Sequence, residues 1–267
     1  MSQRFDSILL VGCGNMAGAM LRGWLAAGAD PKRFTVADPA RPDLPRVRWL
    51  EEVPSEGAFD AILVGVKPQL FNAVAPRVAP LAGSSTSVLS LLAGVDLATL
   101  AAAFPQAWGQ VRVMPNLSVQ VGKAPIALAE RGLSERGRAA LVEFLDPLGM
   151  PEWVPEASFD LVTALAGSGP AFVYRFIDAL AAAAADLGLK REQADRLALA
   201  TVEGAEALAA ASPHSPGELA RRVASPGGMT QEGLEVLDHD GALVRLLSET
   251  LRAARDRGEQ LAEEARK

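Results

Sequence analysis

Three glycines near the start of the sequence have the spacing of a phosphate-binding turn. Gly12, Gly14 and Gly18 stand between the apolar run Ile8–Val11 and a stretch of helical periodicity. We expect Gly12 to make a tight turn, Gly14 to let the backbone approach a phosphate, and Gly18 to let the helix pack on the strand. A helix that begins here presents free N–H groups and about half a unit of positive charge. The stretch therefore predicts a site for the pyrophosphate of a dinucleotide.

Composition restricts the other classes of function. The 267 residues are 49% apolar and carry a net charge of −6, which excludes a disordered chain and argues against a nucleic-acid surface. Cys13 is the only cysteine, so we expect no disulfide framework and, without a signal peptide, a cytoplasmic protein. No apolar run approaches the roughly 20 residues of a membrane span. The two histidines have no ligand-like neighbours, so no metal site is predicted.

The pattern of apolar residues changes near the middle of the chain. Strands are expected at 8–11, 34–38, 47–50, 61–66, 87–92, 111–114, 125–129 and 151–154, with helices after the glycine turn, at 96–104 and from 134. Beyond Val154 the sequence is rich in alanine, and helices are expected from 168, at 191–211, at 216–223, at about 231–237 and at 242–265. We therefore expect an α/β protein with an N-terminal Rossmann-like, doubly wound, mostly parallel sheet (residues 1–157) and an all-helical C-terminal domain (residues 158–267).

Two charged residues follow predicted strands. Asp38 has the spacing of a carboxylate that bonds the adenosine ribose and repels a 2′-phosphate, which would favour NAD. It is equally interpretable as a turn residue before Pro39, and Arg41 lies close enough in sequence to receive a 2′-phosphate instead. Lys67 would meet a cofactor if it follows a parallel strand, although a lone lysine is more often a solvated surface charge.

The helical half carries two apolar stripes and one glycine-bearing loop. The stripes are expected to face the core, and they comprise Val173, Phe176, Ile177, Leu180, Ala184 and Leu187 on the first long helix and Leu197, Thr201, Val202, Ala205 and Leu208 on the second. The loop Ser225–Thr230 could hold a small carboxylate with backbone N–H groups and hydroxyls. The alternative is a plain turn in which Thr230 caps the next helix.

Five motifs, in this order, resemble pyrroline-5-carboxylate reductase across essentially the whole chain. They are Gly12–Ala17, Val66–Pro68, Arg112–Asn116, Thr163 ahead of Gly167–Phe172, and Ser225–Thr230. The resemblance implies reduction of the cyclic imine 1-pyrroline-5-carboxylate to L-proline by hydride from NADPH or NADH, the last step of proline biosynthesis. It also implies homodimers of interleaved helical domains, often assembled into decamers, so that residues 158–267 would bind substrate and form the dimer.

The same resemblance assigns roles to individual residues. The pyrophosphate would be held by Gly12, Cys13, Gly14, Asn15, Met16 and Ala17, and the nicotinamide end would lie by Val66, Lys67, Pro68 and Asn116. The substrate carboxylate would be held by Ser225, Gly227, Gly228 and Thr230. Thr163 would face the ring nitrogen and act as the catalytic residue. A protonated imine already accepts hydride well, so we expect orientation by the protein to matter more than a strong acid.

The sequence departs from the family pattern and leaves other functions open. Arg221 stands where the family usually has an acid, Ser215 where a histidine is common, and Met229 where Thr or Ala is usual. An imine or ketone reductase of the β-hydroxyacid-dehydrogenase-like group would share the two-domain plan, but it commonly places a lysine or an acid as proton donor in the helical domain. A dinucleotide-binding regulatory protein would need only the first half of the chain.

Overall fold

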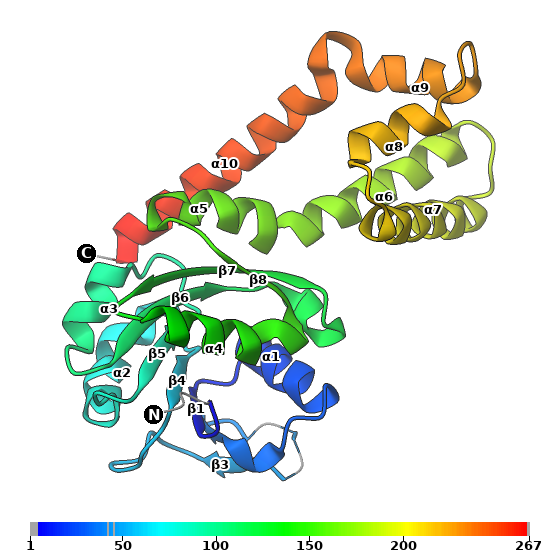
Figure 1. Cartoon of the computed structure of the whole chain (residues 1–267). Helices are drawn as coiled ribbons and strands as arrows, with labels where there is room; N and C mark the ends of the chain where they lie inside the picture. Colours follow the sequence, from blue (N-terminus) through cyan, green and yellow to red (C-terminus); the bar gives the residue numbers. More distant parts are fainter. Residues whose placement is uncertain (1–4, 42, 45, 266–267) are drawn as a thin grey trace. The chain divides into compact units, whose positions relative to one another are not determined.

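An eight-stranded sheet dominates the first part of the chain in this computed structural model, which describes residues 5–41, 43–44 and 46–265 (Figure 1). The strands are β1 (Ile8–Val11), β2 (Phe34–Ala37), β3 (Arg48–Leu50), β4 (Ala61–Val64), β5 (Ser87–Ser90), β6 (Gly109–Met114), β7 (Ala124–Arg131) and β8 (Gly149–Trp153). Their order is β3-β2-β1-β4-β5-β6-β7-β8, and every neighbouring pair is parallel except β6 with β7. The predicted doubly wound, mostly parallel sheet is confirmed.

Helices cover both faces of this sheet, so its central strands are continuous apolar runs. On one face, α1 (Asn15–Ala26) and α4 (Glu135–Leu145) pack on residues of β1, β2 and β6. On the other face lie α2 (Phe71–Val78), α3 (Leu97–Ala103) and α5 (Phe159–Val162). As predicted, Asp96 and Ser134 begin helices, because their side chains accept hydrogen bonds from the backbone N–H groups of Thr99 and Gly137.

The sequence analysis missed α2 and the segment around Thr163. Prolines at 68, 76 and 80 argue against a helix, yet α2 forms between short 3₁₀ turns, Pro68–Leu70 and Ala79–Leu81, and contains Pro76. Residues Thr163–Gly167 form a π-helical turn directly after α5. Such turns are uncommon and frequently lie at functional sites.

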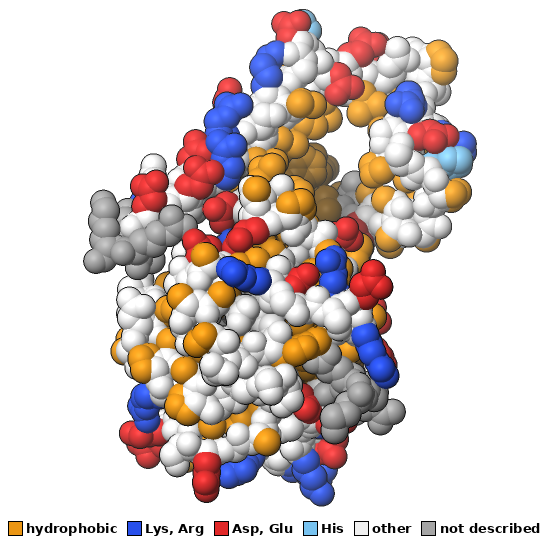
Figure 2. All heavy atoms as spheres, turned by 60° about the vertical axis from the view of Figure 1, so that its left-hand side comes forward, with side chains coloured by type: hydrophobic (Ala, Val, Ile, Leu, Met, Phe, Trp, Pro, Cys, Tyr) orange, Lys and Arg blue, Asp and Glu red, His pale blue; other side chains and the backbone are white. Residues whose placement is uncertain are grey.

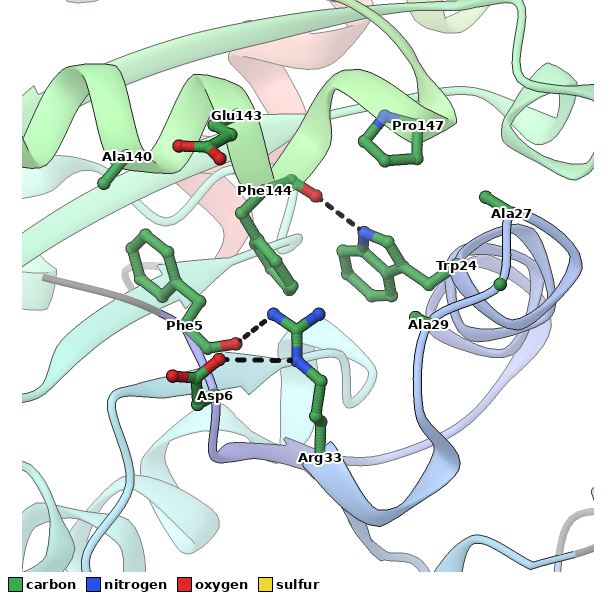
Figure 3. Close-up of a pocket in the computed structure, with 11 residues that line it drawn as sticks. Phe5, Asp6, Trp24, Ala27, Ala29, Arg33, Ala140, Glu143, Phe144 and Pro147 are labelled. Carbon is green, nitrogen blue, oxygen red and sulfur yellow. Dashed lines mark hydrogen bonds and ion pairs between the residues drawn. The ribbon is translucent and has the colours of Figure 1, made fainter.

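An aromatic cluster lies at the C-terminal end of α1 (Figure 3). The Trp24 ring stacks on Phe144 with ring centroids 4.6 Å apart, and the Trp24 indole N–H donates to the Phe144 carbonyl at 2.9 Å. Phe5 stacks on the same Phe144 ring, and Arg33 donates to the Phe5 carbonyl. A cavity of about 630 Å³ opens beside these side chains.

The helical part of the chain consists of α6 (Gly169–Asp186), α7 (Arg191–Ala211), α8 (Pro216–Val223), α9 (Met229–Asp238) and α10 (Ala242–Ala265). By internal contacts the chain divides into one unit up to Ser168 together with the segment from Ala254, and a second unit, Gly169–Ala253. Residues 158–168 thus pack with the sheet, whereas the assignment of 158–267 as a substrate-binding and dimerisation domain stays a prediction. Over the described residues, no helix combines the length and the apolarity needed to cross a membrane.

The expected inward stripes of α6 and α7 hold only in part for the single chain, since Ile177 and Ala184 pack against the contact between the two helices but most of the large apolar residues do not. The buried residues between these helices are Ala181, Ala194 and Ala198, whose small side chains allow close approach. Phe176 is 52% exposed, and Leu197 and Leu208 are also exposed. Most of the large apolar side chains are therefore exposed outside the contact between α6 and α7, and Figure 2 shows exposed apolar side chains on the helical part.

Gly12 and Gly14 provide a matched test of the turn after β1. Gly12 has φ +84°, and a Cβ there would lie 2.9 Å from both the backbone nitrogen and Cγ1 of Val66. Gly14 has φ −69°, and a Cβ there would meet no atom within 4 Å. We expect Gly12→Ala to lower the free energy of unfolding by about 2 kcal/mol or more, through backbone strain and overpacking.

Gly14→Ala is the control, with an expected change within about 0.5 kcal/mol. Urea unfolding of the ligand-free protein measures both variants. Equal losses in the two variants would contradict the assignment of the close contact to Gly12.

Candidate functional site

The ends of β1 and β4 meet where the order of the sheet reverses. From β1 the chain adds β2 and β3 on one side, and then returns to add β4 on the other side. Val11 pairs with Val64, so the turn at Gly12 and the segment from Gly65 emerge side by side at one edge of the sheet. In open α/β sheets, ligands bind outside the carboxyl ends of the strands at such a switch point.

The N-terminus of α1 is open at this edge. Gly14 is the N-cap residue, no side chain caps the helix, and no acidic residue lies in its first turn. The free N–H groups and the positive end of the helix dipole are therefore available to an anion. Because a Cβ at Gly14 would fill space that the protein leaves empty, the turn fits close approach of a phosphate.

The Asp38 side chain is hydrogen-bonded to the backbone of the glycine turn. Its Oδ2 accepts the Cys13 backbone N–H at 2.6 Å, and its Oδ1 accepts the Ala40 N–H at 2.7 Å. The second contact is the turn role predicted for Asp38-Pro39, and the first places the carboxylate at the glycine turn. The two interpretations of Asp38 therefore do not exclude each other.

The Cys13 thiol is held in its neutral form. Burial raises its pKa above the ordinary value, the nearby Asp38 carboxylate raises it further, and Arg22 opposes the shift. The side chain is partly buried and packs against the hydrophobic cluster on the α1 face of the sheet, which gives Cys13 a packing role at the turn.

Trp49 on β3 holds the other side of this loop. Its indole N–H donates to the Asp38 backbone carbonyl at 2.9 Å, and the guanidinium of Arg41 lies 5.9 Å from its ring centroid. Arg41, the other candidate for a cofactor contact, thus has an aromatic partner. No role for Trp49 follows from the sequence, because an isolated aromatic residue within a short predicted strand carries no signal of its own.

The Val66–Pro68 segment follows β4 at the same edge. Val66 contacts Gly12, Lys67 is exposed, and Pro68 begins the 3₁₀ turn before α2. The close approach of α1 to the sheet is made by Ala17, since a Cβ on Gly65 would lie 2.9 Å from the Cβ of Ala17. Gly18, to which the sequence analysis gave that role, would meet only the Cys13 carbonyl and the flexible end of Arg22, at 3.3 Å or more.

Asn116 and Thr163 belong to the same unit of the chain, and Asn116 bonds to the turn that contains Thr163. The Asn116 side chain is 4% exposed; its Nδ2 donates to the Ala166 carbonyl at 2.8 Å, and its Oδ1 accepts the Ser118 N–H. Asn116 thereby ties the loop after β6 to the π-helical turn that begins at Thr163. The Thr163 hydroxyl donates to the Phe159 carbonyl at 2.8 Å, because a carbonyl oxygen can only accept. The lone pairs of that hydroxyl are left for another donor.

The loop Ser225–Thr230 belongs to the other compact unit. Gly228 is the N-cap residue of α9, and no side chain caps this helix, so the expectation that Thr230 caps it is wrong. Thr230 lies in the first turn of α9, and the Gly227 N–H donates to the Gln231 side chain. The preceding helix α8 begins at Ser215, whose hydroxyl accepts the Glu218 N–H, and Arg221 is exposed on it.

The large cavity of Figure 3 lies away from these residues. It adjoins Trp24 and Gly28 at the C-terminal end of α1, and 12 helical residues separate it from the glycine turn by roughly 18 Å. None of the predicted cofactor residues lines it. In the described part of the chain, no three His, Cys, Asp or Glu side chains are grouped to hold a metal ion.

Comparisons with known proteins agree with this arrangement. A family model described as "Pyrroline-5-carboxylate reductase dimerisation" matches residues 156–261. The chain is 33% identical over 266 residues to a pyrroline-5-carboxylate reductase of Pseudomonas aeruginosa, covering 96% of this chain and 97% of that protein. It is 42% identical over 183 residues to one of Aquifex aeolicus, covering 68% of each.

A solved structure shares the fold over nearly the whole length. The pyrroline-5-carboxylate reductase of Coxiella burnetii aligns with a TM-score of 0.86 at 28% identity, covering 97% of this chain and 99% of that one. Identity at this level over both halves of the chain carries the assignment. This chain belongs to the pyrroline-5-carboxylate reductase family.

Proposed function

We propose that this protein reduces 1-pyrroline-5-carboxylate to L-proline with NADPH or NADH. The observation that carries the proposal is the Thr163 hydroxyl, which presents hydrogen-bond acceptors from a π-helical turn in a member of this family. A related β-hydroxyacid-dehydrogenase-like reductase would use a lysine or an acid as proton donor. The acid that shares a small cavity with Thr163 is Asp160, and it is paired with Arg112, so the group offered to substrate is the neutral Thr163 hydroxyl. A purely regulatory role would not need it.

The residues at the sheet edge fit the dinucleotide. Gly12, Cys13, Gly14, Asn15, Met16 and Ala17 would hold the pyrophosphate, since the first turn of α1 has free N–H groups and no opposing acid. Asp38 would bond the adenosine ribose, and Val66, Lys67, Pro68 and Asn116 would lie by the nicotinamide. The dinucleotide, when bound, supplies hydride to the imine carbon.

Thr163 would orient the imine nitrogen. Its proton is committed to the Phe159 carbonyl, so its free lone pairs suit an N–H donor, which only the protonated imine offers. The nitrogen keeps that proton as hydride reaches the carbon, and its positive charge disappears. Thr163 need not supply a proton, and its role is to fix which face of the ring meets the hydride donor.

The substrate carboxylate would be held by Ser225, Gly227, Gly228 and Thr230. The support is the uncapped N-terminus of the ten-residue helix α9, where backbone N–H groups and two hydroxyls are available to an anion. Ser215 and Arg221 both precede this loop, at the start and within α8, and replace none of these groups.

The helical unit would form a homodimer. Within the described residues, its buried apolar cluster contains only Ala181, Ala194 and Ala198, while large apolar side chains are exposed on α6, α7 and α10. The match to a dimerisation model over 156–261 supports this assembly, and we propose that dimers assemble further, up to a decamer. We propose a cytoplasmic location as well, since a chain with one cysteine has no disulfide framework.

The direct test is the oxidation of NADPH or NADH, followed at 340 nm, by the full chain with 1-pyrroline-5-carboxylate. We expect turnover that depends on the imine, with proline as the product. Binding of the dinucleotide without turnover would overturn the proposal and favour a regulatory protein. Turnover only with a ketone would favour a different reductase.

Replacing Thr163 tests its role. We expect Thr163→Val to lower kcat about tenfold or more, because a hydrogen bond to a charged group is lost, while the affinity for the dinucleotide changes little. Thr163→Ser, which keeps the hydroxyl and its bond to Phe159, is the control and should retain most of the activity. Unchanged kinetics in Thr163→Val would exclude the role.

Replacing Asp38 tests the choice of cofactor. A carboxylate beside the ribose repels a 2′-phosphate, so Asp38→Ser should raise the ratio of kcat/KM for NADPH to that for NADH about tenfold. Efficiency with NADH should fall as well, because Cys13 loses the acceptor of its N–H. The control is Asp43→Ser, which removes the same charge from an exposed position in the same loop. An equal shift in both variants would contradict a specific role of Asp38.

A further inference from the structure

Arg112 is a buried charge to which the proposed chemistry gives no task. It lies within β6, three residues before the Pro115-Asn116 turn, and is 5% exposed. Its Nη1 lies 3.4 Å from Glu156 Oε1, and its Nη2 lies 3.6 Å from Asp160 Oδ1. Arginines are rarely buried unless paired, so its two acidic partners belong with it.

The guanidinium also stacks on the residue that orients Thr163. Its central carbon lies 4.0 Å from the ring centroid of Phe159, which is 1% exposed. The backbone carbonyl of this Phe159 accepts the Thr163 hydroxyl. A cavity of about 40 Å³ is lined in part by Arg112, Asp160 and Thr163, so the three side chains face one small space.

The three contacts of Arg112 restrain the segment 156–163 at three different residues. Glu156 is held at its start, where Oε1 also accepts the Leu97 N–H, and Asp160 is held one turn before Thr163. The planar guanidinium stacks on Phe159 between the two carboxylates. Lysine has one point charge and no planar face, and it could not make all three contacts.

We propose that Arg112 is a positioning residue for Thr163, acting through Phe159, Asp160 and Glu156. Asn116 anchors the far end of the same π-helical turn by its bond to the Ala166 carbonyl, so Arg112 and Asn116 hold the turn from both sides. The inference rests on the proposed function, because it gives Arg112 a part in presenting the Thr163 acceptor to the imine. Small misplacements of such groups cost large factors in rate.

The test is a double-mutant cycle on the full-length protein with Arg112→Lys and Thr163→Val. We expect Arg112→Lys alone to lower kcat about tenfold or more, with the Kd for the dinucleotide changed less than twofold. In the Thr163→Val background, the same change should cost less than threefold, because no hydroxyl remains to be positioned. Equal losses in both backgrounds, or no loss in either, would overturn the proposal.

Arg138 provides a matched control for Arg112. Arg138 also stacks on an aromatic ring, at 4.4 Å from the Trp153 centroid, and pairs with Glu130 at 3.5 Å. Arg138→Lys should leave kcat within twofold; a loss as large as that of Arg112→Lys would refute a specific effect.

If circular dichroism shows that Arg112→Lys does not fold, Asp160→Asn replaces it in the cycle, since this isosteric change at a partly exposed side chain removes one partner of Arg112. The same non-additivity is expected, and additive losses would again overturn the inference. Wild-type protein that does not oxidise the dinucleotide with the imine would refute the proposed function itself, whereas an active wild type with an additive cycle refutes only the role of Arg112.

Discussion

The close contact between the turn after β1 and the end of β4 is the constraint on which the site depends. Gly12 lies so near the Val66 backbone that no side chain fits, and its positive φ turns the chain into α1. That turn aims the free N–H groups of α1 outward at the reversal point of the sheet. Asp38 then fixes the loop from the β2 side through the Cys13 N–H. The geometry of the glycine turn therefore depends on strand register as much as on glycine content.

Two anchors hold the π-helical turn that begins at Thr163 to the same sheet. Arg112 pairs with Glu156 at the start of the segment that leads to Thr163, and Asn116 donates to Ala166 within the π-helical turn Thr163–Gly167. Both residues come from one motif, Arg112–Asn116, that spans the end of β6, so a single strand end sets the position of Thr163. This arrangement gives a physical reason why the motif has an arginine at its start and an asparagine at its end. It also explains how a segment without regular α-helical bonding holds one conformation.

The two units differ in how far they bury their apolar side chains. The sheet unit buries aromatic and aliphatic side chains on both faces, whereas the described helical unit buries mainly alanines. At about 25 cal/mol for each Å² of apolar surface, leaving residues such as Phe176 and Leu197 in water forgoes much of the available stabilisation. The helical unit thus depends on a partner surface, as membership of a family with a dimerisation domain implies.

The sequence by itself determined the strands, most helices and the helix starts at Asp96 and Ser134, because these follow from local periodicity and from single residues that accept N–H groups of the first turn. It also determined the glycine turn and, through five motifs in order, the family. It did not reveal α2, whose prolines argue against a helix, nor the faces of α6 and α7, where small residues pack inward. Only the tertiary structure decided that Ala17 makes the close contact with the sheet and that Asp38 bonds the glycine turn. The same is true of Arg112 and Thr163, 51 positions apart in the sequence, because such contacts depend on which strand ends are neighbours and not on any local pattern.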